Sequence, residues 1–255
     1  MGQLIVLVIL LCASLTARSE QGPLVAAASS LRTLWQNLSE GYTNDTGNSA
    51  PRASFASSGL LSTQIINGAP FELFLSADLE SIDRLNKLQT PESTQIYALG
   101  ELALVAPRNN VYSEPFSLSS LAMQIRQSKN RDAWRLSIPN PVHAPYGRAA
   151  RAALQSVNLW PLPDGHLLAA ENAAQTLQFV KSGAVAAALV PRSLLNESDD
   201  KLVIAFLPHD SYPPVEHAVA LLQSHGDSAR AFHDWLLSDK SHALLKKAGL
   251  RLPAP

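Results

Sequence analysis

The sequence predicts an α/β fold, and three observations support this prediction. Apolar runs of strand type alternate with amphipathic helical stretches along most of the chain, a pattern typical of βα units in largely parallel sheets covered on both faces. Of the 255 residues, 46% are hydrophobic and 16% charged, which suits a sizeable core in one large domain or two smaller ones. The formal net charge is −1 without a long basic run, so neither a nucleic-acid partner nor an anionic membrane surface is expected.

The first element is an apolar block, Leu4–Leu11, followed by small residues. It is too short to span a bilayer comfortably and is typical of a secretory signal peptide, which we place at residues 1–19 with cleavage after Ala17 or Ser19. No Lys or Arg precedes the block, and an uncleaved anchor is the alternative. Cys12 follows a leucine rather than a small residue, which disfavours lipid attachment. Cys12 is the only cysteine of the sequence. The mature chain would lack it, and could therefore form neither disulfides nor cysteine-ligated metal centres.

Seven apolar runs after the leader predict strands. They cover residues 23–28, 51–56, 71–77, 101–107, 135–140, 184–190 and 201–208. Amphipathic stretches separate most of them. The stretch from Ser228 to Gly249 keeps apolar residues at near-helical spacing, with an interruption at "SDKSH", and predicts two helices in tandem.

Two of the strand-to-helix joints are rich in serine. Ser29 and Ser30 stand between the first strand and a helical pattern of apolar residues, and Ser57 and Ser58 stand between the second strand and the next helix. Serines at such positions usually cap the free amides of the helix. Hydroxyl donors, exposed N–H groups and the positive end of the helix dipole also suit the binding of an oxyanion.

Two further joints have the same form. Pro145 precedes Tyr146 at the start of an Ala-rich helix, and proline is common at this position. At the fourth joint, Glu171 or Asn172 can cap a helix that ends at Gly183. Open α/β sheets bind ligands beyond the carboxyl ends of their strands, and we therefore hypothesise that the four joints converge. The joints alone leave anion binding and ordinary helix capping equally open.

From about Leu24 to the C-terminus, the chain resembles the periplasmic molybdate-binding proteins that serve ABC transporters. The resemblance depends on the motifs in combination, since each of them alone is weak. They are "AAASSL", "SFASSGLLSTQIINGAPFELFLSAD", "LGELALVAPRN", "IPNPVHAPYGRAARAAL", "FLPHDSYPPVEHAVAL" and "AFHDWLLSDKSHALLKKAGL".

This resemblance implies a type II periplasmic binding protein, in which two α/β lobes close over one tetrahedral oxyanion. Lobe 1 would comprise residues 20–99 and 215–255, and lobe 2 residues 100–214. The crossings between the lobes would lie near Leu99–Glu101 and His209–Val215. The implied protein is a periplasmic monomer without cofactor or enzymatic activity, which delivers molybdate, and tungstate as well, to a membrane permease with a cytoplasmic ATPase.

The resemblance also implies which residues bind the oxyanion. Ser29 matches the first hydroxyl of the family, Ser30 a neighbouring polar side chain, and Ser58 the hydroxyl of the second joint. Tyr146 falls where members present a tyrosine hydroxyl or a backbone amide, and Ala173 where they donate a backbone N–H. On this reading Ser29 and Ser30 cap the helix and bind the anion at once. No residue would bind the metal atom directly.

Two positions depart from the family pattern. Some members carry a tyrosine ligand where this chain has Val190 and Pro191, and Tyr146 is the residue that could replace it. Arg148 stands close to a pocket that should be uncharged. We expect its side chain to point to solvent, and the alternative is that it alters the choice of anion.

The residue types at the joints favour fully ionised dianions. Molybdate, tungstate and sulfate only accept hydrogen bonds, whereas protonated phosphate also needs an acceptor, and an unpaired buried polar group costs about 1–3 kcal/mol. Sulfate binding on the same fold is therefore the closest alternative. A serine hydrolase that uses Ser58 or Ser29 is a second, but "ASSG" lacks the GxSxG pattern. Asp78 is expected to be a solvated or capping residue, and the histidines show no metal-binding spacing and are expected at the surface.

Overall fold

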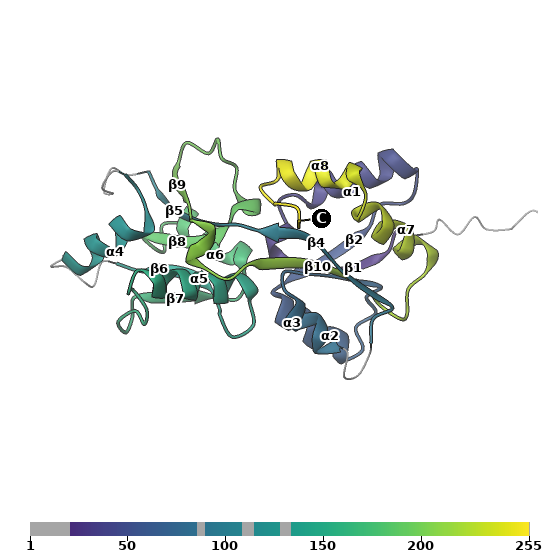
Figure 1. Cartoon of the computed structure of the whole chain (residues 1–255), viewed down its shortest axis with the longest axis horizontal. Coiled ribbons are helices and arrows are strands. Elements are labelled where there is room, and N and C mark those ends of the chain that lie inside the picture. The colour runs from purple at the N-terminus through teal and green to yellow at the C-terminus, as the bar shows by residue number, and fades with distance from the viewer. Residues whose placement is uncertain (1–20, 86–89, 109–114, 128–133, 255) are drawn as a thin grey trace, which may run out of the picture.

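The computed structural model describes residues 21–85, 90–108, 115–127 and 134–254. The predicted signal peptide, with Cys12, lies outside these residues. The described chain forms two five-stranded sheets, each with helices on its faces, which lie end to end along the long axis of the molecule (Figure 1). No helix within the described residues is long and apolar enough to cross a membrane.

The first sheet has the strand order β2-β1-β3-β10-β4. Strands β1 (Leu24–Ala28), β2 (Arg52–Ala56) and β3 (Leu73–Ser76) are parallel, and β10 (Val215–Leu221) runs antiparallel to both β3 and β4 (Ser93–Gly100). The helices of this half are α1 (Trp35–Thr46), α2 (Ser58–Ile66), α3 (Leu79–Asp83), α7 (Asp227–Leu236) and α8 (Asp239–Lys247). The predicted pair of tandem C-terminal helices is thereby confirmed.

The second sheet has the order β7-β6-β8-β5-β9. Its parallel strands are β6 (Leu136–Pro139), β7 (Leu167–Ala170) and β8 (Ala187–Pro191), whereas β5 (Leu102–Pro107) runs antiparallel to β8 and to β9 (Leu202–Phe206). The helices of this half are α4 (Leu118–Gln127), α5 (Pro145–Ser156) and α6 (Ala173–Lys181). The three parallel strands of each sheet fit the prediction of largely parallel sheets, and the antiparallel strands occur where the chain passes between the halves.

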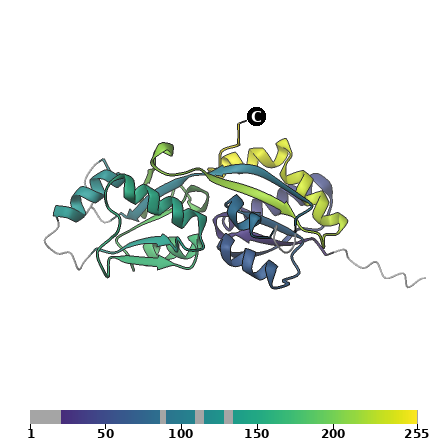
Figure 2. The same cartoon turned by 60° about the horizontal axis from the view of Figure 1, so that its bottom comes forward.

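The chain crosses between the two sheets along neighbouring paths. Only Glu101 separates β4 of the first sheet from β5 of the second, and the return runs through a short 3₁₀ helix, His209–Ser211, into β10. Strands β4 and β10 pair with each other along their length and bridge the two halves (Figure 2). The two halves are therefore joined on one side of the molecule by this pair of strands, β4 and β10, which we call the hinge strands.

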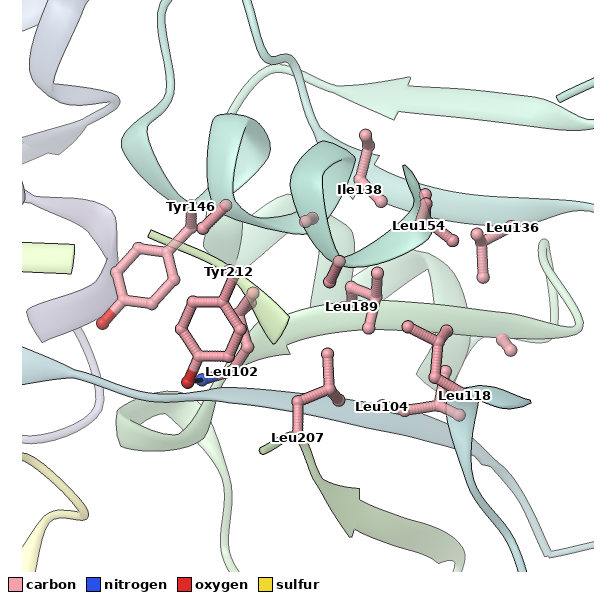
Figure 3. Close-up of a cluster of buried hydrophobic side chains, with 14 of the residues drawn as sticks. Leu102, Leu104, Leu118, Leu136, Ile138, Tyr146, Leu154, Leu189, Leu207 and Tyr212 are labelled. Atoms are coloured by element: carbon pink, nitrogen blue, oxygen red, sulfur yellow. Dashed lines mark hydrogen bonds between the residues drawn. The ribbon is translucent and has the colours of Figure 1, made fainter. Parts of the chain in front are cut away.

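Apolar side chains fill both faces of each sheet. In the first half, Leu38, Tyr42 and Phe232 pack under α1, α7 and α8, and a second cluster with Leu61 and Ile82 lies under α2 and α3. In the second half, Leu104, Leu154 and Leu189 belong to the cluster beneath α4 and α5 shown in Figure 3, while Val180 of α6 packs on the opposite face. Burial on both faces explains why the strands are nearly continuous apolar runs.

Candidate functional site

A small cavity lies between the two halves, where the carboxyl ends of β1, β2 and β3 face the starts of α5 and α6. All five predicted site residues line it. The lining consists of Ala28, Ser29, Ser30, Ala56, Ser57, Ser58, Ala77, Ala144, Pro145, Tyr146 and Ala173. The four joints, far apart in the sequence, therefore converge as hypothesised. Whether these residues bind an anion remains a prediction.

Ser29 and Ser30 follow β1 directly and are almost fully buried. The backbone N–H of Ala173, at the start of α6, donates to Ser29 Oγ at 3.1 Å. A hydroxyl can accept and donate at the same time, so this bond leaves the hydrogen of Ser29 available to an acceptor. Ser30 Oγ is buried and has no hydrogen-bond partner within the described part of the chain. Since buried polar atoms are rarely unpaired, this hydroxyl indicates a place for an acceptor.

The prediction that these two serines cap a helix is wrong. They begin a 3₁₀ helix, Ser29–Leu31, whose N-cap is Ala28 and has no side-chain hydrogen bond. The α-helix begins only at Trp35, after a cap position occupied by Leu34. Neither hydroxyl therefore caps a helix, and both residues line the cavity.

Ser58 is the first residue of α2 and is fully buried. Its Oγ accepts the backbone N–H of Ala77 at 2.9 Å, and this bond likewise leaves its hydroxyl hydrogen available to an acceptor. Ser57 holds the N-cap position, but its side chain does not cap the helix. It pairs instead with His143 Nδ1 from the other half at 2.7 Å, so the first-turn amides of α2 are left without a side-chain cap.

Tyr146 enters the cavity wall from the first turn of α5, which Pro145 begins. Its hydroxyl lies 3.0 Å from His217 Nε2 on β10, and His217 Nδ1 lies 3.4 Å from the hydroxyl of Tyr97. Gly100 permits this approach, because a Cβ atom there would lie 2.0 Å from the Tyr146 hydroxyl. The Tyr146 hydroxyl is therefore held against the hinge strands, while its backbone N–H stands at the open end of α5.

Burial keeps the side chains of Tyr146 and His217 uncharged. It raises the pKa of Tyr146 well above its ordinary value, and it lowers the pKa of His217 to about 3. His217 is fully buried and His233 nearly so, so the expectation of surface histidines is wrong for these two residues. The only signal for His217 in the sequence is its place inside the apolar run "VEHAVAL". Among the described residues, no group of His, Cys, Asp and Glu could hold a metal ion.

The expectation that Arg148 points to solvent is also wrong. Arg148 Nη2 hydrogen-bonds Asp78 Oδ2 and lies 3.6 Å from Glu80 Oε2, and only 27% of its side chain is exposed. Asp78 caps α3 by accepting the N–H of Ser81, as expected for a capping aspartate. The charge of Arg148 is thus balanced by a carboxylate of the other half. Val190 and Pro191, where some family members have a tyrosine, are buried in β8 and are not among the residues that line the cavity.

The donors around the cavity suit an acceptor-only ligand. They are the hydroxyls of buried serines, two of which accept amide hydrogens through their oxygens, together with amides at helix starts, of which that of Ala173 donates to Ser29 Oγ. Such a set stabilises negative charge without a charged side chain. The contacts of Ser29 and Ser58 are backbone amides rather than the histidine that would activate a nucleophile.

The chain matches known proteins over nearly its whole length. Residues 23–251 match the family model described as bacterial extracellular solute-binding protein. The molybdate-binding protein ModA of Escherichia coli is 30% identical over 240 residues, which cover 92% of this chain and 91% of that protein.

Two solved structures share the fold. The periplasmic molybdate-binding protein of Azotobacter vinelandii superposes with a TM-score of 0.79 at 26% identity, over 91% of this chain and all of that one. The sulfate-binding protein SubI of Mycobacterium tuberculosis superposes with a TM-score of 0.72 at 14% identity, over 92% of this chain and 88% of that one. At this identity the likeness supports the fold alone. With its two-sheet architecture and the match of residues 23–251, the chain belongs to the family of bacterial extracellular solute-binding proteins.

Proposed function

We propose that this chain is an extracytoplasmic binding protein that captures molybdate, and tungstate with it, and delivers the anion to an ABC transporter permease. The observation that carries the proposal is the cavity at which four distant joints meet and which presents hydroxyl and amide donors. The similarity to molybdate-binding proteins of Escherichia coli and Azotobacter vinelandii supports the choice of anion. The protein performs no chemistry on the anion.

In this proposal the anion is held by the hydroxyls of Ser29, Ser30 and Ser58, by Tyr146, and by the N–H of Ala173, which donates to Ser29 Oγ in this structure and would be shared with the anion. The residues come from two lobes, 20–99 with 215–255 and 100–214, which close over the ligand as a monomer. The leader, residues 1–19, directs the chain to the periplasm. Tungstate is nearly the same size as molybdate and accepts the same hydrogen bonds, so both anions enter.

Phosphate and sulfate differ from molybdate in different ways. Protonated phosphate would leave its O–H without an acceptor among these donors, at a cost of about 1–3 kcal/mol. Sulfate accepts the same bonds as molybdate but is smaller, so its exclusion depends on the radius of the closed cavity. A sulfate-binding protein on this fold is thus the alternative that most needs a test.

Calorimetric titration of the protein from residue 20 onward, with each anion in one buffer, tests the proposal. We expect one-to-one binding of molybdate and tungstate and little heat from sulfate or phosphate. Ser58→Ala should weaken molybdate binding about tenfold or more, because one charge-assisted hydrogen bond of about 1.5–3 kcal/mol is lost. Ser62→Ala is the matched control, since Ser62 is a buried serine of the same helix outside the cavity lining.

Several outcomes would contradict the proposal. Strong sulfate binding would identify sulfate as the ligand. Absence of binding heat with all four anions would rule out oxyanion binding. Turnover of an ester or amide that Ser58→Ala abolishes would favour the hydrolase.

A further inference from the structure

One ion pair links the two halves just outside the cavity wall. Arg148 lies in the first turn of α5, which packs on the second sheet, and Asp78 is the N-cap of α3, which packs on the first. Their side chains hydrogen-bond each other, and Glu80 of α3 lies 3.6 Å from the same guanidinium. The contact therefore exists only when the two halves are close together.

The position of this pair connects it to the binding cavity. Ala77, the neighbour of Asp78, lines the cavity, and so does Tyr146, two residues before Arg148. The exposed fractions of the two side chains are 27% for Arg148 and 16% for Asp78. Water and salt screen such a partly buried pair less than a surface pair.

The carboxylate is held in place by its own half of the molecule. Asp78 Oδ1 accepts the N–H of Ser81 and the hydroxyl of Ser76, each at 3.1 Å. This leaves Oδ2 for Arg148. Because the acceptor is already ordered, little side-chain entropy is lost at Asp78 when Arg148 arrives.

We propose that Arg148 and Asp78 form a clamp that stabilises the closed arrangement of the two lobes and so raises the affinity for the oxyanion without contacting it. The inference rests on the proposed function. A residue that favours only the closed state changes the apparent affinity through the population of that state. Since the clamp does not contact the ligand, molybdate and tungstate affinities change by the same factor.

A direct electrostatic effect of the two charges on the anion makes a different prediction. Loss of the Arg148 charge would weaken anion binding, but loss of the Asp78 charge would strengthen it, because the anion is repelled by a carboxylate. A clamp requires both losses to weaken binding. The sign of the effect at Asp78 therefore separates the two explanations.

The test measures molybdate and tungstate affinities of Arg148→Gln, Asp78→Asn and the double variant. Asparagine is a good N-cap residue and preserves the start of α3. Arg151→Gln is the control, because it removes an exposed arginine on the same helix. We expect about three- to tenfold weaker binding for each single variant, no further loss in the double variant, and no change in the control. Stronger binding by Asp78→Asn, or additive losses, would overturn the clamp.

A second measurement keeps this test separate from the choice of ligand. The protein from residue 20 onward contains no cysteine, so spin labels can be placed through Gln64→Cys on α2 and Gln155→Cys on α5, both exposed positions. Without added anion, the clamp predicts a smaller fraction of the short label-to-label distance in Arg148→Gln than in the parent. An unchanged fraction would overturn the clamp even if no tested anion bound.

Discussion

At the scale of single residues, the site combines available hydrogen-bond donors with an uncharged wall. Ser29 and Ser58 each accept a backbone N–H, which leaves their hydroxyl hydrogens for a ligand. On the hinge side, Tyr146 and His217 are buried and neutral. A cavity of this kind suits a dianion, which oriented dipoles stabilise at helix starts elsewhere.

The buried histidine makes the stability of the fold depend on pH. The pKa of His217 falls from 6.5 to about 3 on folding, because burial penalises the charged ring. Above pH 6.5 both the folded and unfolded states hold a neutral ring. Between about pH 6.5 and 3 the unfolded state binds a proton that the folded state excludes, so the free energy of unfolding falls as the pH falls.

Urea unfolding at pH 7, 6 and 5 measures this effect, with His217→Gln as the comparison. Glutamine cannot be protonated, so the variant should lose less stability than the parent as the pH drops. Carboxylates contribute equally to both proteins. Identical pH slopes for the two would show that His217 is not a buried neutral histidine.

At the scale of elements, the helix starts determine how closely the two halves approach. The N–H of Gly59, in the first turn of α2, donates to the carbonyl oxygen of His143 at 3.0 Å across the interface. A Cβ atom on Gly59 would lie 2.8 Å from that oxygen. No side chain fits between the two segments unless they move apart.

Gly59→Ala should therefore hold the lobes apart. We expect molybdate binding to weaken about tenfold or more, since closure is hindered, while the free energy of unfolding without anion changes by less than about 1 kcal/mol, because alanine is the better helix former. Calorimetry and urea unfolding measure the two quantities. Gln64→Ala, an exposed position of the same helix, is the control. Unchanged affinity would mean that this contact does not limit closure.

Much of the element pattern was predictable from the sequence, because it depends on local periodicity. The strand runs, the capping of α6 by Asn172 and the tandem C-terminal helices follow from residues close in the chain. The free hydroxyls of Ser29 and Ser30 could not be predicted in this way. Whether they cap a helix depends on a 3₁₀ turn after β1, and local sequence does not distinguish that turn from the start of an α-helix.

At the scale of the whole molecule, the site exists only where two sheets meet. Its contacts join Ser29 to Ala173, 144 residues apart, and Ser57 to His143, 86 residues apart. The sequence resemblance indicated which joints belong together. The resemblance did not indicate the pairs Arg148–Asp78 and His217–Tyr146, because each pair depends on how closely the two halves pack.

The proposed function requires that one oxyanion occupies the cavity between the two sheets. Crystals grown with molybdate, with diffraction data collected at the molybdenum absorption edge, test it most directly. We predict a single anomalous peak in the cavity, its oxygens within hydrogen-bonding distance of Ser29 Oγ, Ser58 Oγ and the N–H of Ala173. A peak elsewhere on the protein, or no peak at saturating molybdate, would contradict the account.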